Sequence, residues 1–521
     1  MFRRQLLRPG VLFIAFLVSS APGFSPARGS DDATAAPPRP AMVIVHATVL
    51  DGTGSPGRRA NVRIEGDLIV SVGSAAPRSG DVIVEGAGLT LAPGFIDTHS
   101  HGDDQIFDIP DATADTSQGI TTIVVGQDGG SYYPLERFFR RLDRHPPAVN
   151  VASYSGHGTL REKVMGDDFR RPATADEVAE MRRLLEKDMR AGAVGLSSGL
   201  EYDPGIYSAP EEVIDLAKTA ASFSGRYISH IRSEDRNFWK AIDEIIEIGR
   251  QAKLPVQISH TKLAMRKNWG QAGALMAKLD RARASGVNIT ADMYPYLYWE
   301  STLTVLFPER DFENREVASL VLKEIAPPDG LLMTQFDPEP SYVGKTIAMI
   351  ARLRGSDPAT TLMDMIRMSE AMRLETGHGV ESVIGTSMRE ADVEPLLTWR
   401  WMNFCTDGYL DGPHPRGYGS YPRILGHYVR ERRVMKLSEA IRKASGLAAA
   451  NMGFTDRGLI KPGLRADLVL FDAARVKDRA TPADPHVVSD GIVSVWVNGV
   501  LVYREGKSTG EHPGRVLRRA P

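Results

Sequence analysis

Four histidines and one aspartate stand at the ends of short apolar runs of the kind that form buried strands. His99 and His101 end PGFIDTHSH, His230 ends RYISH, His260 ends VQISH, and Asp407 ends NFCTD. Residues two apart on a strand point the same way, so His99 and His101 converge on one point. Imidazole nitrogen and carboxylate oxygen suit zinc and similar divalent ions. We therefore predict that these five residues hold one or two metal ions.

The chain around these residues alternates between β-branched runs and longer helical stretches. The runs include GITTIVVG, AVNVASYSG, AVGLSSG and VNITADMY, and the stretches between them include EEVIDLAKTAASFSG and FWKAIDEIIEIGRQAK. This alternation is typical of an α/β fold with a parallel sheet, and about eight such strands predict a (β/α)8 barrel over residues 93–454. In such a barrel the chemistry takes place where the strands end. An open doubly wound sheet is the alternative, but no G-x-G-x-x-G turn follows an early strand.

Short strands with turns are predicted on both sides of the barrel. Residues 42–92 contain MVIVHATVL and ANVRIEGDLIVSVG, and residues 455–510 contain ADLVLFDAARV and GIVSVWVNGVLVYREG. We predict that these two parts form one small β-sandwich domain into which the barrel is inserted. Residues 300–345 do not read as a single crossover helix, so we interpret them as an insertion in the barrel.

The composition is that of an ordinary soluble globular protein. The chain has 521 residues, 42% of them hydrophobic and 25% charged. Its net charge of −2, without basic runs beside exposed aromatics, argues against a nucleic-acid partner. The only cysteine is Cys405, which excludes an intramolecular disulfide.

The N-terminus has the pattern of a signal peptide. MFRRQLLR is basic, VLFIAFLVSSA is apolar, and small and polar residues follow. We predict a signal peptide over residues 1–30, a linker over 31–41, and export to a periplasm or beyond. A single membrane anchor is the alternative, but the apolar run falls short of the ~20 residues that a spanning helix needs, so no stable span is expected after cleavage.

A series of motifs resembles the amidohydrolase superfamily, and more narrowly its D-aminoacylase (N-acyl-D-amino-acid deacylase) branch. In chain order they are PGFIDTHSHGD, TSQGITTIVVG, GLSSGLEY, SHIR, SHTK, TADMYPY, CTDG, PHPR and KPGLRADLVLFD. The HxH motif alone indicates only the superfamily, whereas SHIR, SHTK and PHPR are more specific to the branch. The resemblance implies metal-dependent hydrolysis of N-acyl-D-amino acids, with zinc as the cofactor and manganese or cobalt as alternatives.

The same resemblance implies roles for the residues at the strand ends. His99 and His101 would bind one metal position, and His230 and His260 the other. Asp407 would act as the general base, which takes a proton from the attacking water and returns it to the leaving amine.

Two acidic residues are further candidates for metal ligands, and one of them stands where several members of the branch have a cysteine. Several members carry a cysteine ligand in a G-N-C-G segment, and here that segment is Gly126 to Gly129 with Asp128 in the place of the cysteine. Asp128 is either an oxygen ligand or a bystander in a glycine-rich turn. Other amidohydrolases place a carboxylated lysine or a glutamate near Glu201, so we expect Glu201 to bridge two metal ions.

The resemblance also implies residues that bind the substrate. Positions matching Lys262 in SHTK and Arg416 in PHPR are associated in the family with the substrate carboxylate, which an ammonium and a guanidinium both suit. The alternative for both is a surface cation. Tyr202 and Tyr294 are candidates for the pocket wall, with a core or turn position as the alternative.

Two rival functions follow from the same residues. A dipeptidase that releases a C-terminal D-amino acid would use the same site, because an aminoacyl group is also an acyl group. It would need an acid that binds the free α-amine, for which Asp103, Asp104 and Asp203 are candidates. A non-catalytic binding protein is disfavoured, because all four histidines and Asp407 are present.

Overall fold

Parallel strands with buried side chains form the centre of the fold. The computed structural model describes residues 40–74 and 76–519. The parallel strands are β6 (Phe95–Asp97), β7 (Ile120–Val125), β8 (Asn150–Ser153), β9 (Ser155–Gly156), β10 (Gly195–Gly199), β11 (Arg226–His230), β12 (Val256–Ile258), β13 (Ile289–Met293) and β17 (Met402–Phe404). They pair in the orders β6-β7-β8 and β9-β10-β11-β12-β13-β17, and each pair is parallel. The predicted α/β class is confirmed.

Backbone hydrogen bonds join the last parallel strand to the first. The Asp407 N–H, after β17, donates to the His99 carbonyl, and the His101 N–H, after β6, donates to the Gly408 carbonyl, each over 2.9 Å. Only Tyr154 separates β8 from β9. The carboxyl ends of these strands are therefore held side by side.

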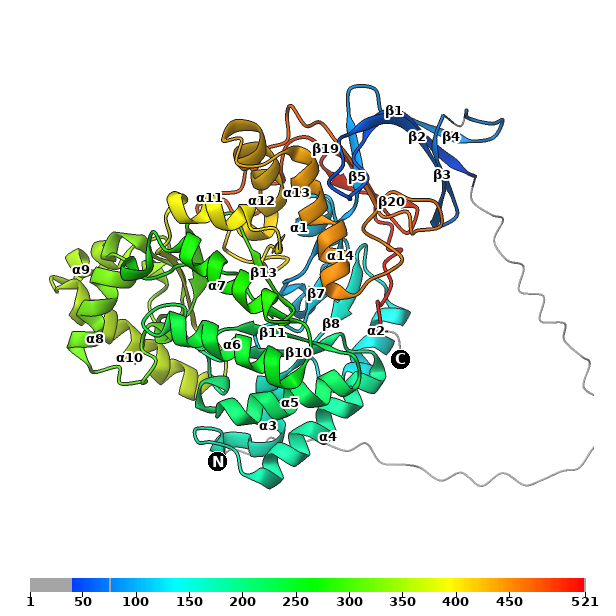
Figure 1. Cartoon of the computed structure of the whole chain (residues 1–521). Helices are drawn as coiled ribbons and strands as arrows, with labels where there is room; N and C mark the ends of the chain where they lie inside the picture. The colour runs from blue at the N-terminus through cyan, green and yellow to red at the C-terminus, as the bar shows by residue number, and fades with distance from the viewer. Residues whose placement is uncertain (1–39, 75, 520–521) are drawn as a thin grey trace, which may run out of the picture. The chain divides into compact units, whose positions relative to one another are not determined.

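Helices connect the parallel strands and cover them. The green helices α5 to α7 (Figure 1) pack on the parallel strands: α5 contacts β10 and β11, α6 contacts β12, and α7 contacts β13. Helix α4 shows why such segments form: Thr174 and Glu177 make a capping box at its start, and Gly192 ends it in a left-handed conformation. The helices are α1 (Thr113–Thr116), α2 (Leu135–Arg144), α3 (His157–Met165), α4 (Ala175–Ala191), α5 (Pro210–Ser222), α6 (Phe238–Ala252), α7 (Ala272–Ala284), α11 (Glu390–Thr398), α12 (Arg416–Arg423), α13 (Leu437–Ala444) and α14 (Gly446–Met452).

A three-stranded antiparallel sheet interrupts the alternation between β13 and β17. Its strands are β14 (Tyr298–Ser301), β15 (Leu331–Phe336) and β16 (Glu381–Thr386), in the order β14-β16-β15. Helices α8 (Arg315–Leu320), α9 (Ile347–Arg354) and α10 (Pro358–Thr376) lie between these strands along the chain. The predicted insertion at 300–345 was too short, because the sheet is completed only by β16.

The two ends of the described chain share one further sheet. Its strands are β1 (Met42–Val49), β2 (Arg58–Glu65), β3 (Leu68–Gly73), β4 (Val82–Glu85), β5 (Thr90–Pro93), β18 (Leu468–Phe471), β19 (Ile492–Val497), β20 (Val500–Arg504) and β21 (Lys507–Ser508). Strand β5 pairs with β1 on one side and with β18 on the other, which joins the two ends. Ile44, Val62, Leu468 and Trp496 belong to its buried apolar cluster. The strands are one nine-stranded sheet, and a two-sheet sandwich stays a prediction.

The predicted leader at residues 1–30 and nearly all of the linker at 31–41 lie outside the described residues. Within residues 40–74 and 76–519, none of the helices combines the length and the apolar character that crossing a membrane requires.

Candidate metal centre

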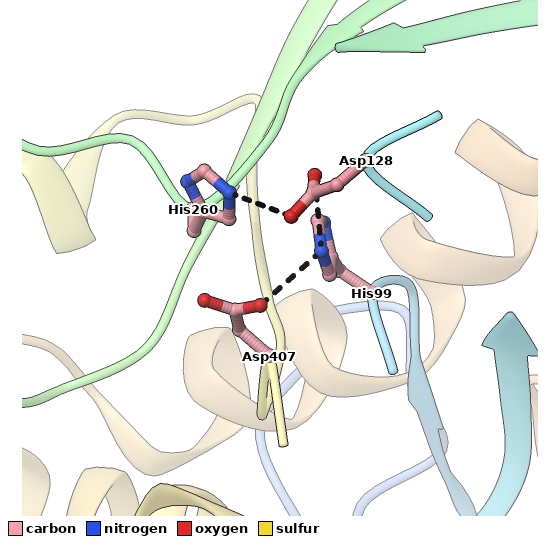
Figure 2. Close-up of side chains that lie close together, drawn as sticks. All are labelled: His99, Asp128, His260 and Asp407. Carbon is pink, nitrogen blue, oxygen red and sulfur yellow. Dashed lines mark ion pairs between the residues drawn. The ribbon is translucent and has the colours of Figure 1, made fainter. Parts of the chain in front are cut away.

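Two histidines and two aspartates from four strand ends face one another (Figure 2). The His99 Nε2 atom lies 3.3 Å from Asp407 Oδ1 and 3.5 Å from Asp128 Oδ1, and the His260 Nε2 atom lies 3.4 Å from Asp128 Oδ2. One nitrogen or oxygen atom from each residue lies within 4.8 Å of all the others. They follow β6, β7, β12 and β17, so the parallel strands bring together residues that are far apart in the sequence.

The donor atoms of this group suit a metal ion. Both ring nitrogens of His99 and the Oδ1 atom of Asp128 are buried, and neither residue has a hydrogen-bond partner for these atoms. Buried polar atoms are nearly always satisfied, so the unsatisfied His99 Nε2 and Asp128 Oδ1 atoms, which lie 3.5 Å apart, need an explanation. Imidazole nitrogens and carboxylate oxygens are the ligands that zinc takes. The residues present therefore fit a divalent cation.

A second group adjoins the first through His260. The His230 Nδ1 and His260 Nε2 atoms are 3.0 Å apart, and the Glu234 Oε1 atom lies 3.1 Å from His260 Nδ1. His230, Glu234 and His260 form the second set that could hold an ion. Sequence reasoning missed Glu234, which stands four residues after His230 in SHIRSED. The only indication in the sequence was that an acidic residue follows closely after a strand-end histidine.

His101 and Glu201 lie at opposite sides of these two groups. The His101 Nε2 atom is 3.2 Å from Asp407 Oδ1 and 3.6 Å from Asp128 Oδ2. The Glu201 Oε2 atom is 2.9 Å from His230 Nε2. The structure thus places all the sequence-predicted ligands in one network. Within it the Asp128 carboxylate lies near three histidines, whereas Glu201 lies near His230.

The backbone at this centre adopts an uncommon conformation. Asp128, His260 and Asp407 have φ values of 51°, 30° and 50°, in the left-handed region that residues other than glycine seldom adopt. Such conformations persist only where the surrounding structure holds them, and they gather at functional sites. The side chains of these three residues are therefore held in place by the fold.

Buried aspartates behind the centre hold the strand ends. The Asp97 Oδ1 atom accepts hydrogen bonds of 3.1 Å from the backbone N–H groups of His99 and Thr406, which joins the ends of β6 and β17. The Asp292 Oδ1 atom accepts from the His260 N–H over 2.6 Å. These contacts fix the backbone from which the histidines project.

The carboxylates and histidines shift each other's pKa values. Burial lowers the pKa of His99, but the charges of Asp128 and Asp407 outweigh burial and raise it to about 10. Burial would raise the pKa of Asp407, but Arg416 and the histidines hold it well below its usual range. Burial instead lowers the pKa of His230 to about 4. The metal centre thus contains many closely spaced titratable groups, and a bound cation would change their pKa values.

The two cations predicted to bind substrate are buried beside the centre. Lys262 and Arg416 are each 4% exposed, which excludes the alternative of surface cations. The Lys262 Nζ atom lies 2.6 Å and 2.7 Å from the two Glu234 oxygens, and the Arg416 Nη1 atom lies 2.6 Å from Asp407 Oδ2. The ring of Tyr294 faces both cations, 5.9 Å from Lys262 and 5.0 Å from Arg416.

These residues line an inner cavity of about 50 Å³. Lys262, Arg416 and Tyr294 contribute to its wall, and so does Tyr202, whose ring centroid is 4.3 Å from that of His230. Both tyrosines thus lie in the pocket wall next to the predicted metal ligands.

The positions of Asp128 and Glu201 lead to a test of metal content. We expect Asp128→Ala to lower the metal-to-protein ratio more than Glu201→Ala does, because Asp128 lies near three histidines and Glu201 near one. Elemental analysis of the purified variants measures the ratio. Asp176→Ala, at an exposed position on α4, is the control. A larger loss in Glu201→Ala would reverse the assignment.

A family model for amidohydrolases matches residues 83–335 and 343–503 of this chain. The chain belongs to the amidohydrolase family. An N-acyl-D-glutamate deacylase from Alcaligenes xylosoxydans xylosoxydans is 36% identical over 502 residues, which cover 92% of this chain and 96% of that protein. The predicted resemblance is confirmed.

Solved structures of amidohydrolases share the fold over nearly their whole length. A D-aminoacylase described as having a binuclear metal centre superposes with a TM-score of 0.81 and 33% identity, covering 93% of this chain and 100% of that one. An N-acyl-D-glutamate deacylase from Bordetella bronchiseptica, in complex with zinc and a phosphonate mimic of the tetrahedral intermediate, gives 0.82 and 34%, covering 92% and 100%. Metal-dependent hydrolysis in these relatives agrees with the donor set found here.

Proposed function

We propose that the chain hydrolyses the amide bond of N-acyl-D-amino acids at the metal centre. One observation carries this proposal: the unsatisfied donor atoms of His99 and Asp128 lie beside Asp407, whose other carboxylate oxygen binds the buried cation Arg416. A metal-binding group and a carboxylate-binding group thus adjoin, as a substrate with an amide next to a carboxylate requires. The relatives that act on N-acyl-D-amino acids support the same substrate class.

The residues of the centre would have separate roles in the reaction. His99, Asp128, His260 and Asp407 would hold one zinc ion, which, when bound, polarises the amide carbonyl and lowers the pKa of a water molecule. Asp407 accepts the proton of the attacking water and returns it to the amine nitrogen as the C–N bond breaks. The acyl carbon keeps the water oxygen, and the products are a carboxylic acid and a D-amino acid.

The inner cavity would receive the amino acid half of the substrate. Lys262 and Arg416 would bind its α-carboxylate, with Tyr294 between them. The rest of the wall includes the buried apolar side chains of Trp299, Leu306 and Ile325. An apolar wall gains free energy from an apolar side chain and leaves a charged one without partners.

The closure of the barrel and the location of the protein are also part of this proposal. We infer that the parallel strands close into a (β/α)8 barrel, which the bonds between the segments after β6 and β17 support. Export to a periplasm or beyond is proposed from the basic and apolar pattern of residues 1–30.

Matched acetyl substrates test the proposed function. We expect zinc-reconstituted protein to hydrolyse N-acetyl-D-leucine, with kcat/KM at least about 100-fold above that for N-acetyl-L-leucine, since a buried carboxylate site fixes the orientation of the α-carbon. N-acetyl-D-glutamate should be a poorer substrate than N-acetyl-D-leucine because of the apolar wall. Release of the free amino acid is the measurement. Equal rates for the two leucine enantiomers would contradict the proposal.

A further inference from the structure

A larger outer cavity of about 770 Å³ adjoins the metal centre, and its wall is strongly acidic. The acids that line it are Asp103, Asp104, Asp128, Glu300, Glu381, Asp407 and Asp411. Arg416 is the one lysine or arginine among its lining residues in the described part of the chain. Clefts lined by charge of one sign concentrate ligands of the opposite sign.

The outer cavity has more acidic residues than the metal-binding group contains. Asp128 and Asp407 belong to the metal-binding group, and Arg416 pairs with Asp407 over 2.6 Å but lies 3.9 Å from Glu300. The remaining acids come from separate places: the turn after His101, the loop after β17, and strands β14 and β16. Their convergence on one cavity therefore does not follow from a single acidic run in the sequence.

Glu381, at the start of β16, provides an independent observation. It is 7% exposed, and its Oε1 atom accepts a hydrogen bond of 2.7 Å from the Leu303 N–H. Its Oε2 atom is buried without a hydrogen-bond partner. Burial raises the pKa of Glu381 to about 8. A buried carboxyl oxygen without a hydrogen-bond partner is costly, and a ligand that donates a hydrogen bond to it would remove this cost.

The position of the cavity indicates which half of the substrate it meets. The inner and outer cavities share Tyr202, Glu300, Ser301, Asp407 and Arg416, so they meet at the metal centre. Lys262 and the apolar wall belong to the inner cavity alone. If the inner cavity holds the D-amino acid, as the proposed function states, the acyl group extends into the acidic outer cavity.

We propose that the preferred acyl group carries a primary ammonium group, which binds in the outer cavity with Glu381 as a direct partner. This inference rests on the proposed function and defines its substrates further. The ammonium has two sources, the α-amine of an aminoacyl group or the terminal amine of a longer ω-amino acyl group. In the first case the enzyme hydrolyses dipeptides that end in a D-residue, and Asp103 and Asp104 line the cavity for that amine.

Isosteric substrate pairs test the proposal on the metal-loaded full chain. Glycyl-D-leucine and N-propionyl-D-leucine differ only by an ammonium in place of a methyl group, and so do 4-aminobutanoyl-D-leucine and N-pentanoyl-D-leucine. We expect kcat/KM to be at least tenfold higher for the amine-bearing member of one pair. A preference in the first pair identifies the α-amine, and a preference in the second identifies the terminal amine.

The variant Glu381→Gln tests the assigned residue. We expect it to reduce the ratio of kcat/KM within the preferred pair at least fivefold. Glu313→Gln makes the same side-chain replacement at an exposed position before α8 and should keep the wild-type ratio. If Glu381→Gln does not fold, as shown by thermal melting, the wild-type ratios still decide whether the preferred acyl group carries an ammonium.

The outcomes separate this inference from the proposed function. Faster hydrolysis of the propionyl and pentanoyl substrates would overturn the ammonium site and leave D-amino acid release intact. An unchanged ratio in folded Glu381→Gln would overturn the role of Glu381. Cleavage restricted to L-leucine conjugates would overturn the proposed function itself.

Discussion

Asp407→Asn is expected to lower kcat by about 100- to 10,000-fold, the usual contribution of a general acid–base residue, while the protein keeps most of its metal. The Asp407 Oδ1 atom lies within 3.3 Å of both His99 and His101, so it faces the place where water would be activated. Asparagine keeps one oxygen as a ligand but cannot take up a proton. Steady-state rates with N-acetyl-D-leucine and elemental analysis of the same sample provide the measurement.

A surface aspartate gives the matched control for this change. Asp243→Asn alters an exposed side chain on α6 that pairs with Lys278, and it should retain wild-type kcat. Near-normal turnover by Asp407→Asn would remove the assigned role. Loss of metal in parallel with activity would show that Asp407 is needed as a ligand rather than as a base.

His260→Ala is expected to remove more metal than any other single histidine replacement at the centre. His260 belongs to both candidate groups, whereas His99 belongs to one and His230 to the other. Its replacement therefore takes a ligand from each group, and activity should fall to background. The metal-to-protein ratio and the rate, both after dialysis against metal-free buffer, are the measurements.

Two further histidine variants complete this experiment. His230→Ala should keep the ion held by His99, Asp128 and Asp407, and so retain a higher metal ratio than His260→Ala. His378→Ala, at an exposed position, should bind metal as the wild type does. Equal metal loss in His230→Ala and His260→Ala would show that the two groups act as one site.

The strand-end pattern explains why much of the centre could be predicted. A polar residue directly after a buried β-branched run lies at the carboxyl edge of a parallel sheet, wherever it is in the sequence. This placed His99, His230, His260 and Asp407 together before any geometry was known. Glu234 was not predicted as a ligand because it lies in a loop after β11. In a loop the direction of the side chain depends on tertiary contacts rather than on the strand period.

The insertion could not be delimited from the sequence for a different reason. Strands β15 and β16 are separated by helices α9 and α10, so no hairpin turn marks their pairing. Local patterns also do not show which edge of a small sheet faces the metal centre. Glu300 on β14 and Glu381 on β16 reach the outer cavity only through that arrangement, and neither has a motif of its own.

The sheet shared by the two chain ends constrains the order in which the protein can fold. Leu91 of β5 pairs with Leu470 of β18. The strands that are synthesised first therefore cannot complete their sheet until the last strands have been synthesised. Contacts between such distant residues slow folding, because the ends of a long loop must meet before any free energy is gained. Until β18 emerges, one edge of β5 is open to pairing with other chains. A chain truncated before Leu468 would keep the metal ligands and still lack the strand that covers this edge.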